Sequence, residues 1–259
     1  MLYKLEIINI SKIFKKNGVE TIALSETNMK IPKGNFVSLI GPSGCGKSTL
    51  FNIIAGLLKP SSGEVLLDGE NIIGKKGCVG YMLQKDLLLP WRTILDNVIL
   101  GLEIKGFTKK ESEERAIPLL HRYGLKGFEH HYPRELSGGM RQRAALLRTL
   151  LYDQDVILLD EPFGALDAQT RLMMQTWLLQ IWSDFKKTVL FVTHDIDEAI
   201  YLSDEIYVLS PRPGRLKAKV TVNLPRPREE QTMLLDDYIR LKQELLELLK
   251  EEEPLKRVE

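Results

Sequence analysis

The chain has 259 residues, of which 44% are apolar and 27% are charged, and its formal net charge is +1. This balance is typical of an ordinary globular protein, and it excludes an acidic solvating tail and a strongly basic nucleic-acid binder. The two cysteines, Cys45 and Cys78, are too few for a disulfide framework and lack metal-ligand spacing, so we expect a reducing compartment, the cytoplasm.

The first part of the chain is predicted to form strands. Its charged N-terminus argues against a secretory signal or a transit peptide. Apolar and polar residues then mix at strand-like spacing over residues 3 to 8 and roughly 20 to 32, and Phe36–Ile40 is a short apolar run that ends at a glycine. These three segments are therefore expected to be strands.

A helical insert is predicted from about Leu87 to Leu151, where Gly and Pro separate helix-like stretches. The stretches are 93–104, 109–123 and 139–152. None of them, and no other part of the chain, approaches the ~18 consecutive apolar residues that a membrane-spanning helix requires. Any membrane role must therefore come through a partner.

Strand-like apolar runs return in the second half of the chain, at 156–159, 189–192 and 206–209. Helical segments lie between the first two runs and again near 196–202. Continuous apolar strands that alternate with helices indicate a parallel sheet covered on both faces. The predicted fold class is therefore α/β with a helical subdomain.

The C-terminal tail after Pro225-Arg226-Pro227 is predicted to be a helix with one apolar face. Its apolar residues recur at steps of four and three, and they are Leu234, Tyr238, Leu241, Leu245 and Leu248. This is at most two heptads, fewer than a coiled coil needs. We expect the helix to dock on its own domain, and self-association is the alternative.

A phosphate-binding loop is predicted at residues 41 to 48, which satisfy G-x-x-x-x-G-K-[ST] between an apolar strand and a helical run. Its glycines let successive N–H groups converge on phosphate oxygens, at the positive end of the helix dipole. We expect Lys47 to reach the β- and γ-phosphates and Ser48 to ligate Mg²⁺. The predicted nucleotide-binding residues here are Gly41, Pro42, Ser43, Gly44, Cys45, Gly46, Lys47, Ser48 and Thr49.

Cys45 in this loop has two interpretations. A helix N-terminus can activate a thiol, which would make it reactive. The plainer interpretation, which we prefer, is that Cys45 fills a position where only a small side chain fits.

Two adjacent carboxylates end the apolar strand at 156–159. Hydrolysis of a phosphoanhydride needs a metal to neutralise charge and a group to orient or deprotonate water. We expect Asp160 to lie in the Mg²⁺ coordination sphere and Glu161 to act on the water. Alone, such a pair would be a solvated strand end, but the phosphate-binding loop favours the catalytic interpretation.

His194 follows the strand at 189–192 in the same way. Ligands of open α/β sheets bind at the carboxyl ends of the strands, so we expect His194 beside the γ-phosphate rather than on a metal. The other histidines, His121, His130 and His131, have no such setting and are predicted to lie at the surface.

Residues 136 to 143, Leu-Ser-Gly-Gly-Met-Arg-Gln-Arg, narrow the class because they resemble the signature motif of the ABC ATPases. Physically, the motif is a Ser-Gly-Gly turn that caps a helix and forms a second anion site without a lysine. One phosphate cradle is already complete in the chain. The resemblance therefore implies that Ser137, Gly138 and Gly139 bind ATP held by a second copy, in a two-fold dimer.

The resemblance extends from residue 3 to about 222 and implies further roles. Gln84 matches the loop that senses Mg²⁺ and couples to the helical subdomain, and Phe14 matches the aromatic that stacks on adenine, with a core phenylalanine as the alternative. Ala165-Leu166-Asp167 matches the loop that crosses the dimer interface. Met140 departs from the usual Gln, which puts one side-chain contact in doubt.

The resemblance also implies an architecture. It is a P-loop NTPase (RecA-like) core with an antiparallel β subdomain and a helical subdomain. The expected ABC ATPase domain spans 1–225, with its core at 1–84 and 155–225 and the helical subdomain at 85–154. The expected tail spans 226–259.

Two stretches, Leu88–Trp91 and Leu209–Arg215, resemble a subgroup, the ATPases of nitrate, sulfonate and taurine importers, and Met140 fits it too. Relatives in this group also import thiamine or riboflavin precursors, so the solute does not transfer. Pro90 and Trp91 match the site that meets the membrane partner, with a turn around a core Trp as the alternative.

The expected protein is thus an ATP- and Mg²⁺-dependent ATPase that acts as a homodimer on transmembrane permease subunits, indirectly serves an extracytoplasmic solute-binding protein, and binds no nucleic acid. It would lie in the cytoplasm, peripheral on the inner face of the membrane. One rival is a soluble ABC ATPase of DNA repair or translation, which would carry tandem cassettes or a coiled-coil insertion. The other is a regulatory subunit without meaningful hydrolysis.

Overall fold

The computed structural model describes residues 3–164 and 166–250, and its centre is a six-stranded sheet with the order β10-β9-β3-β8-β7-β6. The first five strands in chain order are parallel to their neighbours, and only β10 runs antiparallel, against β9. The strands are β3 Phe36–Ile40, β6 Gly80–Met82, β7 Val156–Asp160, β8 Thr188–Val192, β9 Glu205–Leu209 and β10 Leu216–Thr221. The predicted strands at 36–40, 156–159, 189–192 and 206–209 are confirmed.

Every residue of β3, β7 and β8 is buried, because both faces of this sheet are covered. Alternate residues serve different layers: Phe36 packs toward α6, whereas Val37 and Leu39 pack toward α1. The helices of this part are α1 Lys47–Ile54, α6 Ala168–Phe185 and α7 Ile196–Leu202. The α/β fold class predicted from the sequence is correct.

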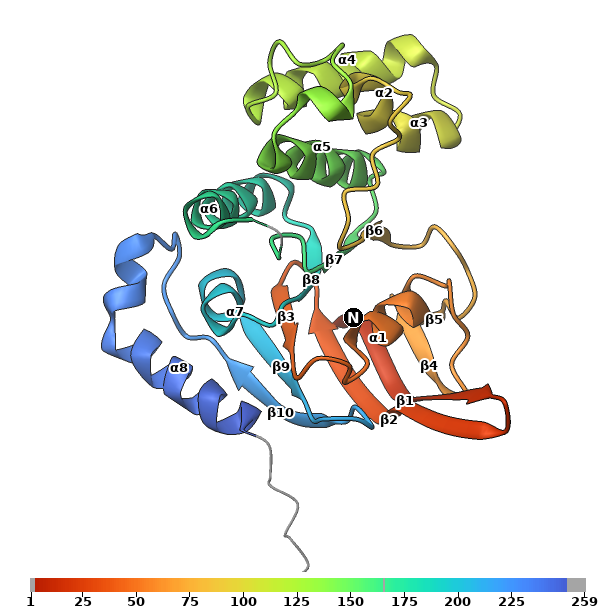
Figure 1. The fold of residues 1–259 in the computed structure, drawn as a ribbon, viewed down its shortest axis with the longest axis vertical. Helices are drawn as coiled ribbons and strands as arrows, with labels where there is room; N and C mark the ends of the chain where they lie inside the picture. Colours follow the sequence, from red (N-terminus) through yellow and green to blue (C-terminus); the bar gives the residue numbers. More distant parts are fainter. Residues whose placement is uncertain (1–2, 165, 251–259) are drawn as a thin grey trace, which may run out of the picture.

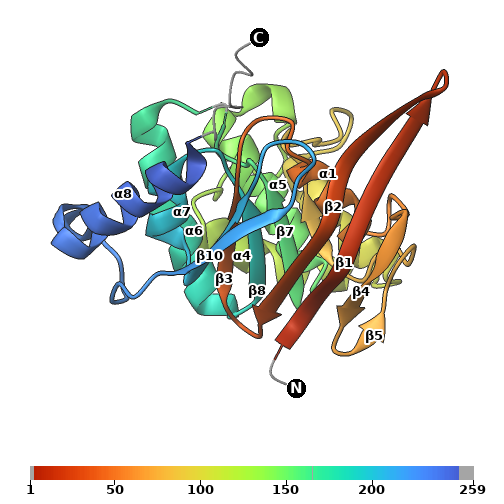
Figure 2. The ribbon, with the colours of Figure 1, turned by 90° about the horizontal axis from the view of Figure 1, so that it is seen from below.

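A second, four-stranded antiparallel sheet has the order β2-β1-β4-β5. Its strands are β1 Tyr3–Lys16, β2 Val19–Pro32, β4 Ser62–Leu67 and β5 Glu70–Asn71. The long β1–β2 hairpin extends away from the core (Figure 2). Residues of α1, β1, β2 and β4 share one apolar cluster, so α1 lies packed between the two sheets.

The helical subdomain stands at one end of the molecule (Figure 1). It contains α2 Ile94–Val98, α3 Leu100–Ile104, α4 Lys109–Arg122 and α5 Gly138–Leu151. The single helical stretch expected at 93–104 is wrong in detail, since the chain turns at Ile99 between two short helices. The turn seats α3 close against α5's end, where a Cβ on Gly101 would lie 3.0 Å from a ring carbon of Tyr152.

The tail docks on its own domain, as expected. Helix α8, Asp236–Leu249, buries Tyr238 and Leu245 in one cluster with α7 and β9. Ahead of it, the buried Arg228 guanidinium donates to the carbonyl oxygens of Ile200, Tyr201 and Ser203 at the end of α7. The predicted tail residues 251–259 lie outside the described residues.

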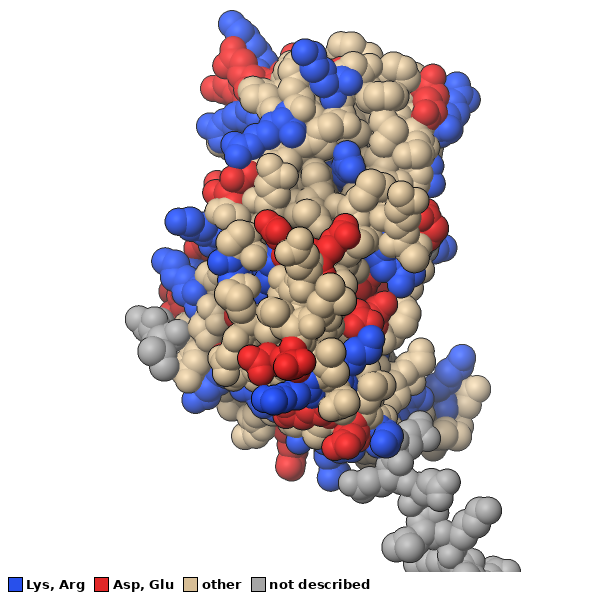
Figure 3. All heavy atoms as spheres, turned by 90° about the vertical axis from the view of Figure 1, so that its left-hand side faces the viewer, with Lys and Arg blue, Asp and Glu red and all other residues tan. Residues whose placement is uncertain are grey.

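Acidic and basic side chains are interspersed on the face that lies to the left in Figure 1, rather than gathered by sign (Figure 3). This pattern agrees with the small net charge. None of the helices in residues 3–164 and 166–250 combines the length and apolarity needed to cross a membrane.

Candidate nucleotide site

The predicted phosphate-binding loop connects β3 to α1, and its glycines are sterically required. Gly46 caps α1 with a φ of 107°, and a Cβ there would lie 2.7 Å from Leu24 Cδ2. The side chain of Lys47 folds over the loop, and its Nζ donates to the carbonyl oxygens of Gly41 at 2.8 Å and Pro42 at 3.1 Å. Cys45 is buried beneath the loop, which fits the small-residue interpretation and not an exposed reactive thiol.

A cavity of about 530 Å³ opens over this loop. It brings together most of the predicted nucleotide and metal residues from four separate parts of the chain. Its lining residues are Phe14, Lys16, Thr21, Ala23, Ser43, Gly44, Gly46, Lys47, Ser48, Thr49, Gln84, Asp160, Glu161 and Arg212. This volume and this combination of an aromatic side chain with convergent polar groups suit a nucleotide.

Phe14 lines the mouth of the cavity near the end of β1. Its side chain is 40% exposed, so the alternative of a core phenylalanine is wrong. Lys12 Nζ lies 5.2 Å from the ring centroid on one side. The role of Phe14 in stacking on adenine stays a prediction.

Asp160 ends β7 at the inner end of the cavity. Its Oδ1 accepts from Ser48 Oγ at 3.5 Å and its Oδ2 from Tyr81 OH at 3.4 Å. Burial raises the pKa of Asp160, and burial beside Asp160 raises that of Tyr81. A desolvated carboxylate is costly without a cation. Asp160, together with the hydroxyl of Ser48, therefore fits Mg²⁺.

The donors available here also fit Mg²⁺ in number. No cluster of three or more His, Cys, Asp or Glu side chains suited to a metal occurs among the described residues. Mg²⁺ commonly takes one or two protein oxygens and completes its shell with phosphates and water. Asp160, Ser48 and the Gln84 side chain are the residues that would hold it.

Glu161 lies next to Asp160, at the centre of a polar triad. Its Oε2 is 3.3 Å from Gln84 Nε2 and 3.3 Å from His194 Nδ1. Its backbone has a φ of 44°, the left-handed region that costs energy for any residue except glycine and that often marks functional sites. Two of the four predicted catalytic side chains, Gln84 and His194, therefore converge on an oxygen of the third, Glu161, whereas the fourth, Lys47, contacts the phosphate-binding loop.

Arg171 on α6 links this triad to the predicted interface loop. Its Nη2 donates to Leu166 O at 3.1 Å, and its Nη1 lies 3.3 Å from Asp195 Oδ2, next to His194. Asp195 in turn caps α7 by accepting from Asp197 N. Ala165 of the predicted loop lies outside the described residues.

The Ser-Gly-Gly turn does not line the cavity. Ser137 is the exposed N-cap of α5, and its Oγ accepts from Met140 N at 3.3 Å. Gly138 and Gly139 form the first turn of the helix. The predicted second anion site therefore lies outside the cavity that Lys47, Asp160 and Glu161 line.

The segment after Gln84 is held by α5. Arg148 donates to the carbonyl oxygens of Asp86 at 2.6 Å and Leu87 at 2.7 Å. Beyond it, Trp91 is 73% exposed, so the alternative of a core Trp in a turn is wrong. An exposed indole of this size suits a protein contact, but that role remains a prediction.

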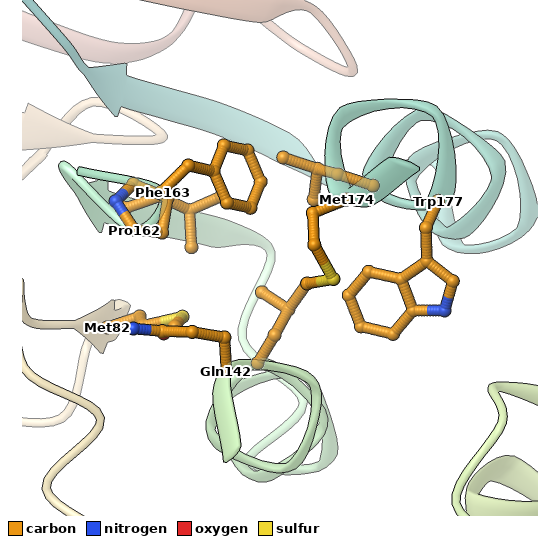
Figure 4. A pocket seen from close by; sticks show the side chains of 9 residues that line it. Met82, Gln142, Pro162, Phe163, Met174 and Trp177 are labelled. Carbon is orange, nitrogen blue, oxygen red and sulfur yellow. The ribbon is translucent and has the colours of Figure 1, made fainter. Parts of the chain in front are cut away.

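A small void lies where α5 meets the loop after β7 (Figure 4). It has a volume of about 10 Å³, and it is lined by Met82, Gln142, Leu146, Leu159, Pro162, Phe163, Met174, Trp177 and Leu178. Among the described residues, the buried Gln142 Oε1 and Trp177 Nε1 find no hydrogen-bond partner. Two buried polar atoms without hydrogen-bond partners therefore lie at the junction between the core and the helical subdomain.

Sequence reasoning missed four residues of the cavity: Lys16, Thr21, Ala23 and Arg212. The position of Arg212 could have been inferred, because it follows β9, whose carboxyl end lies at the same sheet edge as the loop after β3.

Of the other histidines, His121 and His130 are exposed and His131 is half-buried, so the surface prediction holds for the first two.

Comparison with known proteins is consistent with this geometry. The family model described as "ABC transporter" matches residues 24–164. An uncharacterized ABC transporter ATP-binding protein of Methanocaldococcus jannaschii is 48% identical, over 97% of this chain and 93% of the relative. The chain belongs to the ABC transporter family. As an ABC ATPase, it binds ATP and Mg²⁺ and hydrolyses ATP.

Other ABC relatives are named for import. An aliphatic sulfonates import ATP-binding protein of Bacillus cereus is 47% identical, over 85% of this chain and 87% of its own length. A taurine import ATP-binding protein of Yersinia pestis is 47% identical, over 78% of this chain and 79% of its own.

Solved ABC cassettes share the fold. A dimeric bacterial ABC transporter cassette aligns with a TM-score of 0.75 and 34% identity, over 85% of this chain and 99% of that one. A post-hydrolysis dimeric cassette bound to ADP and Pi aligns with a TM-score of 0.74 and 33% identity.

Proposed function

We propose that this ABC ATPase energises the import of a small solute by hydrolysing ATP between two copies of itself. The observation that carries the proposal is the convergence of Lys47, Asp160, Glu161 and His194 at one edge of the parallel sheet. Water attack on a γ-phosphate needs a phosphate cradle, a metal-binding carboxylate and a group that orients the water, here a carboxylate beside an imidazole.

Each residue then has a separate task. Lys47 and the loop amides bind the β- and γ-phosphates, and Asp160, Ser48 and Gln84 hold Mg²⁺. Bound Mg²⁺ neutralises charge on the phosphates. Glu161 orients the attacking water and accepts its proton, and His194 holds the Glu161 carboxylate and contacts the γ-phosphate.

The proposed working unit is a homodimer. Ser137, Gly138 and Gly139 lie outside the chain's own cavity, so they are free to cover the nucleotide of a second copy. A relative of 34% identity is a dimeric cassette, which supports this arrangement. The Asp167 loop would cross the same interface, and Arg171 would connect it to the His194 end of β8.

The membrane partner would contact the segment from Gln84 to Trp91, since Leu87 and Trp91 are exposed there while α5 fixes the backbone behind them. We propose that the ATPase lies on the cytoplasmic face of the membrane, bound to permease subunits. An extracytoplasmic solute-binding protein would deliver the solute to these permease subunits. The names of the sulfonate and taurine relatives support a sulfonate-type anion as solute, and a thiamine or riboflavin precursor is the second candidate.

Reconstitution tests the proposal. The ATPase is copurified with its permease, placed in proteoliposomes and assayed for ATP hydrolysis and for uptake of taurine or an alkanesulfonate. We expect ATP-dependent uptake and hydrolysis stimulated by the permease. If the protein hydrolysed ATP but copurified with no membrane protein, the transport role would be contradicted. If it hydrolysed no ATP with or without the permease, the catalytic role would be contradicted.

A further inference from the structure

The loop between β9 and β10 approaches the phosphate-binding loop at both of its ends. A Cβ on Gly41 would lie 3.0 Å from Leu209 O, and a Cβ on Gly214 would overlap the carbonyl oxygen of Cys45. Gly214 is also tied to β2, because its N donates to Ala23 O at 3.0 Å and its O accepts from Ser25 N at 3.0 Å. The loop is thus wedged between β2 and the phosphate cradle.

The middle of this loop is built to be rigid. Pro211 and Pro213 flank Arg212, and each proline fixes its own φ and restricts the residue before it. Ser210 Oγ donates to Pro213 O at 3.1 Å and accepts from Arg215 N at 3.1 Å, which closes the loop on itself. The backbone therefore holds Arg212 at little further entropic cost on ligand binding.

Arg212 projects from this loop onto the cradle. Its Nε donates to Gly44 O at 3.2 Å, and a Cβ on Gly44 would lie 3.6 Å from its Nη2. The side chain lines the same cavity as Lys47 and Ser48. In the described part of the chain, no carboxylate lies within ion-pairing distance of Arg212, and neither Nη group donates a hydrogen bond.

We propose that Arg212 is a second cationic phosphate ligand, which binds the polyphosphate chain of the nucleotide alongside Lys47. A guanidinium that is always charged, anchored at Nε and open at both Nη atoms can bond a phosphate through two parallel N–H groups. The inference rests on the proposed ATP-binding function and adds a residue to it. It also implies that the loop between β9 and β10 contributes to nucleotide binding.

The same loop supplies a matched control. Arg215 has the same charge and lies three residues away, but it lines a separate depression with Ser210, Pro211 and Lys217. If general positive charge near the cradle were sufficient, the two arginines would behave alike. If contact with phosphate matters, only Arg212 should affect nucleotide affinity.

The test is equilibrium titration of MgADP into the full chain, as wild type, Arg212→Ala, Arg212→Lys and Arg215→Ala, with circular dichroism of each variant. Charge-assisted hydrogen bonds contribute about 1.5–3 kcal/mol, so we expect Arg212→Ala to weaken MgADP binding roughly 10- to 100-fold. Arg212→Lys should recover part of this loss because it retains the charge, and Arg215→Ala should stay within about twofold of wild type.

Three results would overturn the inference. Arg212→Ala could bind MgADP within about twofold of wild type, Arg215→Ala could lose as much as Arg212→Ala, or Arg212→Ala could keep MgADP affinity while losing only ATP-driven dimerisation, which would make it a contact to the second copy. If Arg212→Ala fails to fold, the comparison of Arg212→Lys with Arg215→Lys decides, with a loss expected only in the former. Absence of MgADP binding by the wild type would instead refute the proposed function.

Discussion

The two glycine-containing helix N-termini of this protein, the phosphate-binding loop at 41–48 and the Ser-Gly-Gly turn at 137–139, differ in what surrounds them. The first is enclosed by two sheets, carries a buried lysine and faces two carboxylates. The second is an exposed cap on α5, and the Arg141 guanidinium beside it pairs with Asp86 and donates to Leu136 O. A helix N-terminus thus becomes a complete anion site only through its neighbours, and we expect the second site to obtain its neighbours from another molecule.

The largest expected effect concerns the complete anion site, at the phosphate-binding loop. Glu161→Gln removes the carboxylate that accepts a proton from water, and general bases contribute about 10²–10⁴-fold to rate. We expect kcat for ATP hydrolysis to fall by roughly that factor, while ATP binding persists and the ATP-bound dimer accumulates on gel filtration. The exposed Glu114→Gln on α4 is the control. Unchanged turnover in Glu161→Gln would remove this residue from its role.

The next effect separates affinity from turnover. Lys47→Ala removes the lysine whose Nζ donates to Gly41 O in the phosphate cradle, so nucleotide affinity should fall roughly 10- to 100-fold, as for a lost charge-assisted hydrogen bond. Calorimetric titration with MgADP measures it. The surface variant Lys126→Ala should bind like wild type, and equal affinities in all three proteins would mean that the loop amides alone bind the phosphates.

The incomplete site, the Ser-Gly-Gly turn, can be tested by comparing substitutions at two helix N-caps. Ser137→Ala and Thr108→Ala each delete an N-cap side chain, of α5 and α4, and each should cost about 1 kcal/mol of stability. Only Ser137→Ala should reduce ATP-driven dimerisation and turnover, by roughly tenfold if one charge-assisted bond to phosphate is lost, with MgADP affinity of the single chain unchanged. Analytical ultracentrifugation with ATP distinguishes the two variants. Equal behaviour would reduce Ser137 to a structural cap.

The smallest effect concerns the stability of the metal position. Burial raises the pKa of Asp160, so the folded chain binds this proton more tightly than the unfolded chain. Stability from this group is therefore fully present below the unfolded pKa and declines as pH rises through the folded pKa. At neutral pH Asp160→Asn should raise Tm, by about 2–4 °C for each kcal/mol recovered, while it abolishes Mg²⁺-dependent turnover.

The check is thermal unfolding of Asp160→Asn and of the exposed Asp237→Asn without nucleotide or Mg²⁺, at neutral and acidic pH. The gain in Tm should shrink as the pH is lowered toward the folded pKa of Asp160, and Asp237→Asn should show no such gain. A lower Tm for Asp160→Asn at neutral pH would contradict the desolvation argument.

Local signals in the sequence predicted the parallel core because β3, β7, β8 and β9 are continuous apolar runs. They did not reveal β4, where only Val65, Leu66 and Leu67 are apolar and a polar start hides the strand. They also merged α2 and α3, since the residue at which the chain turns between them, Ile99, is not a Gly or Pro. In both cases the missing information is tertiary.

The site also contains residues that local sequence signals indicate and residues that only tertiary contacts place. Lys47, Asp160 and Glu161 stand in contiguous motifs, so their residue types and the preceding strands indicated them. For Arg212 the sequence indicates only a place in a subgroup pattern, because its contact with Gly44 joins residues 168 positions apart. The roles assigned to Phe14, Gln84 and the Ser137 turn came from family resemblance and still await the experiments above.

The span of the cavity wall, from Phe14 near the start to Arg212 near the end, has a consequence for biogenesis. Chains fold while the ribosome is still extending them, N-terminal parts first. The loop at 41–48 emerges early, yet the segment that wedges against it is among the last to be made. We therefore expect a nascent polypeptide to offer ATP an unfinished cradle until about four-fifths of its length has been translated.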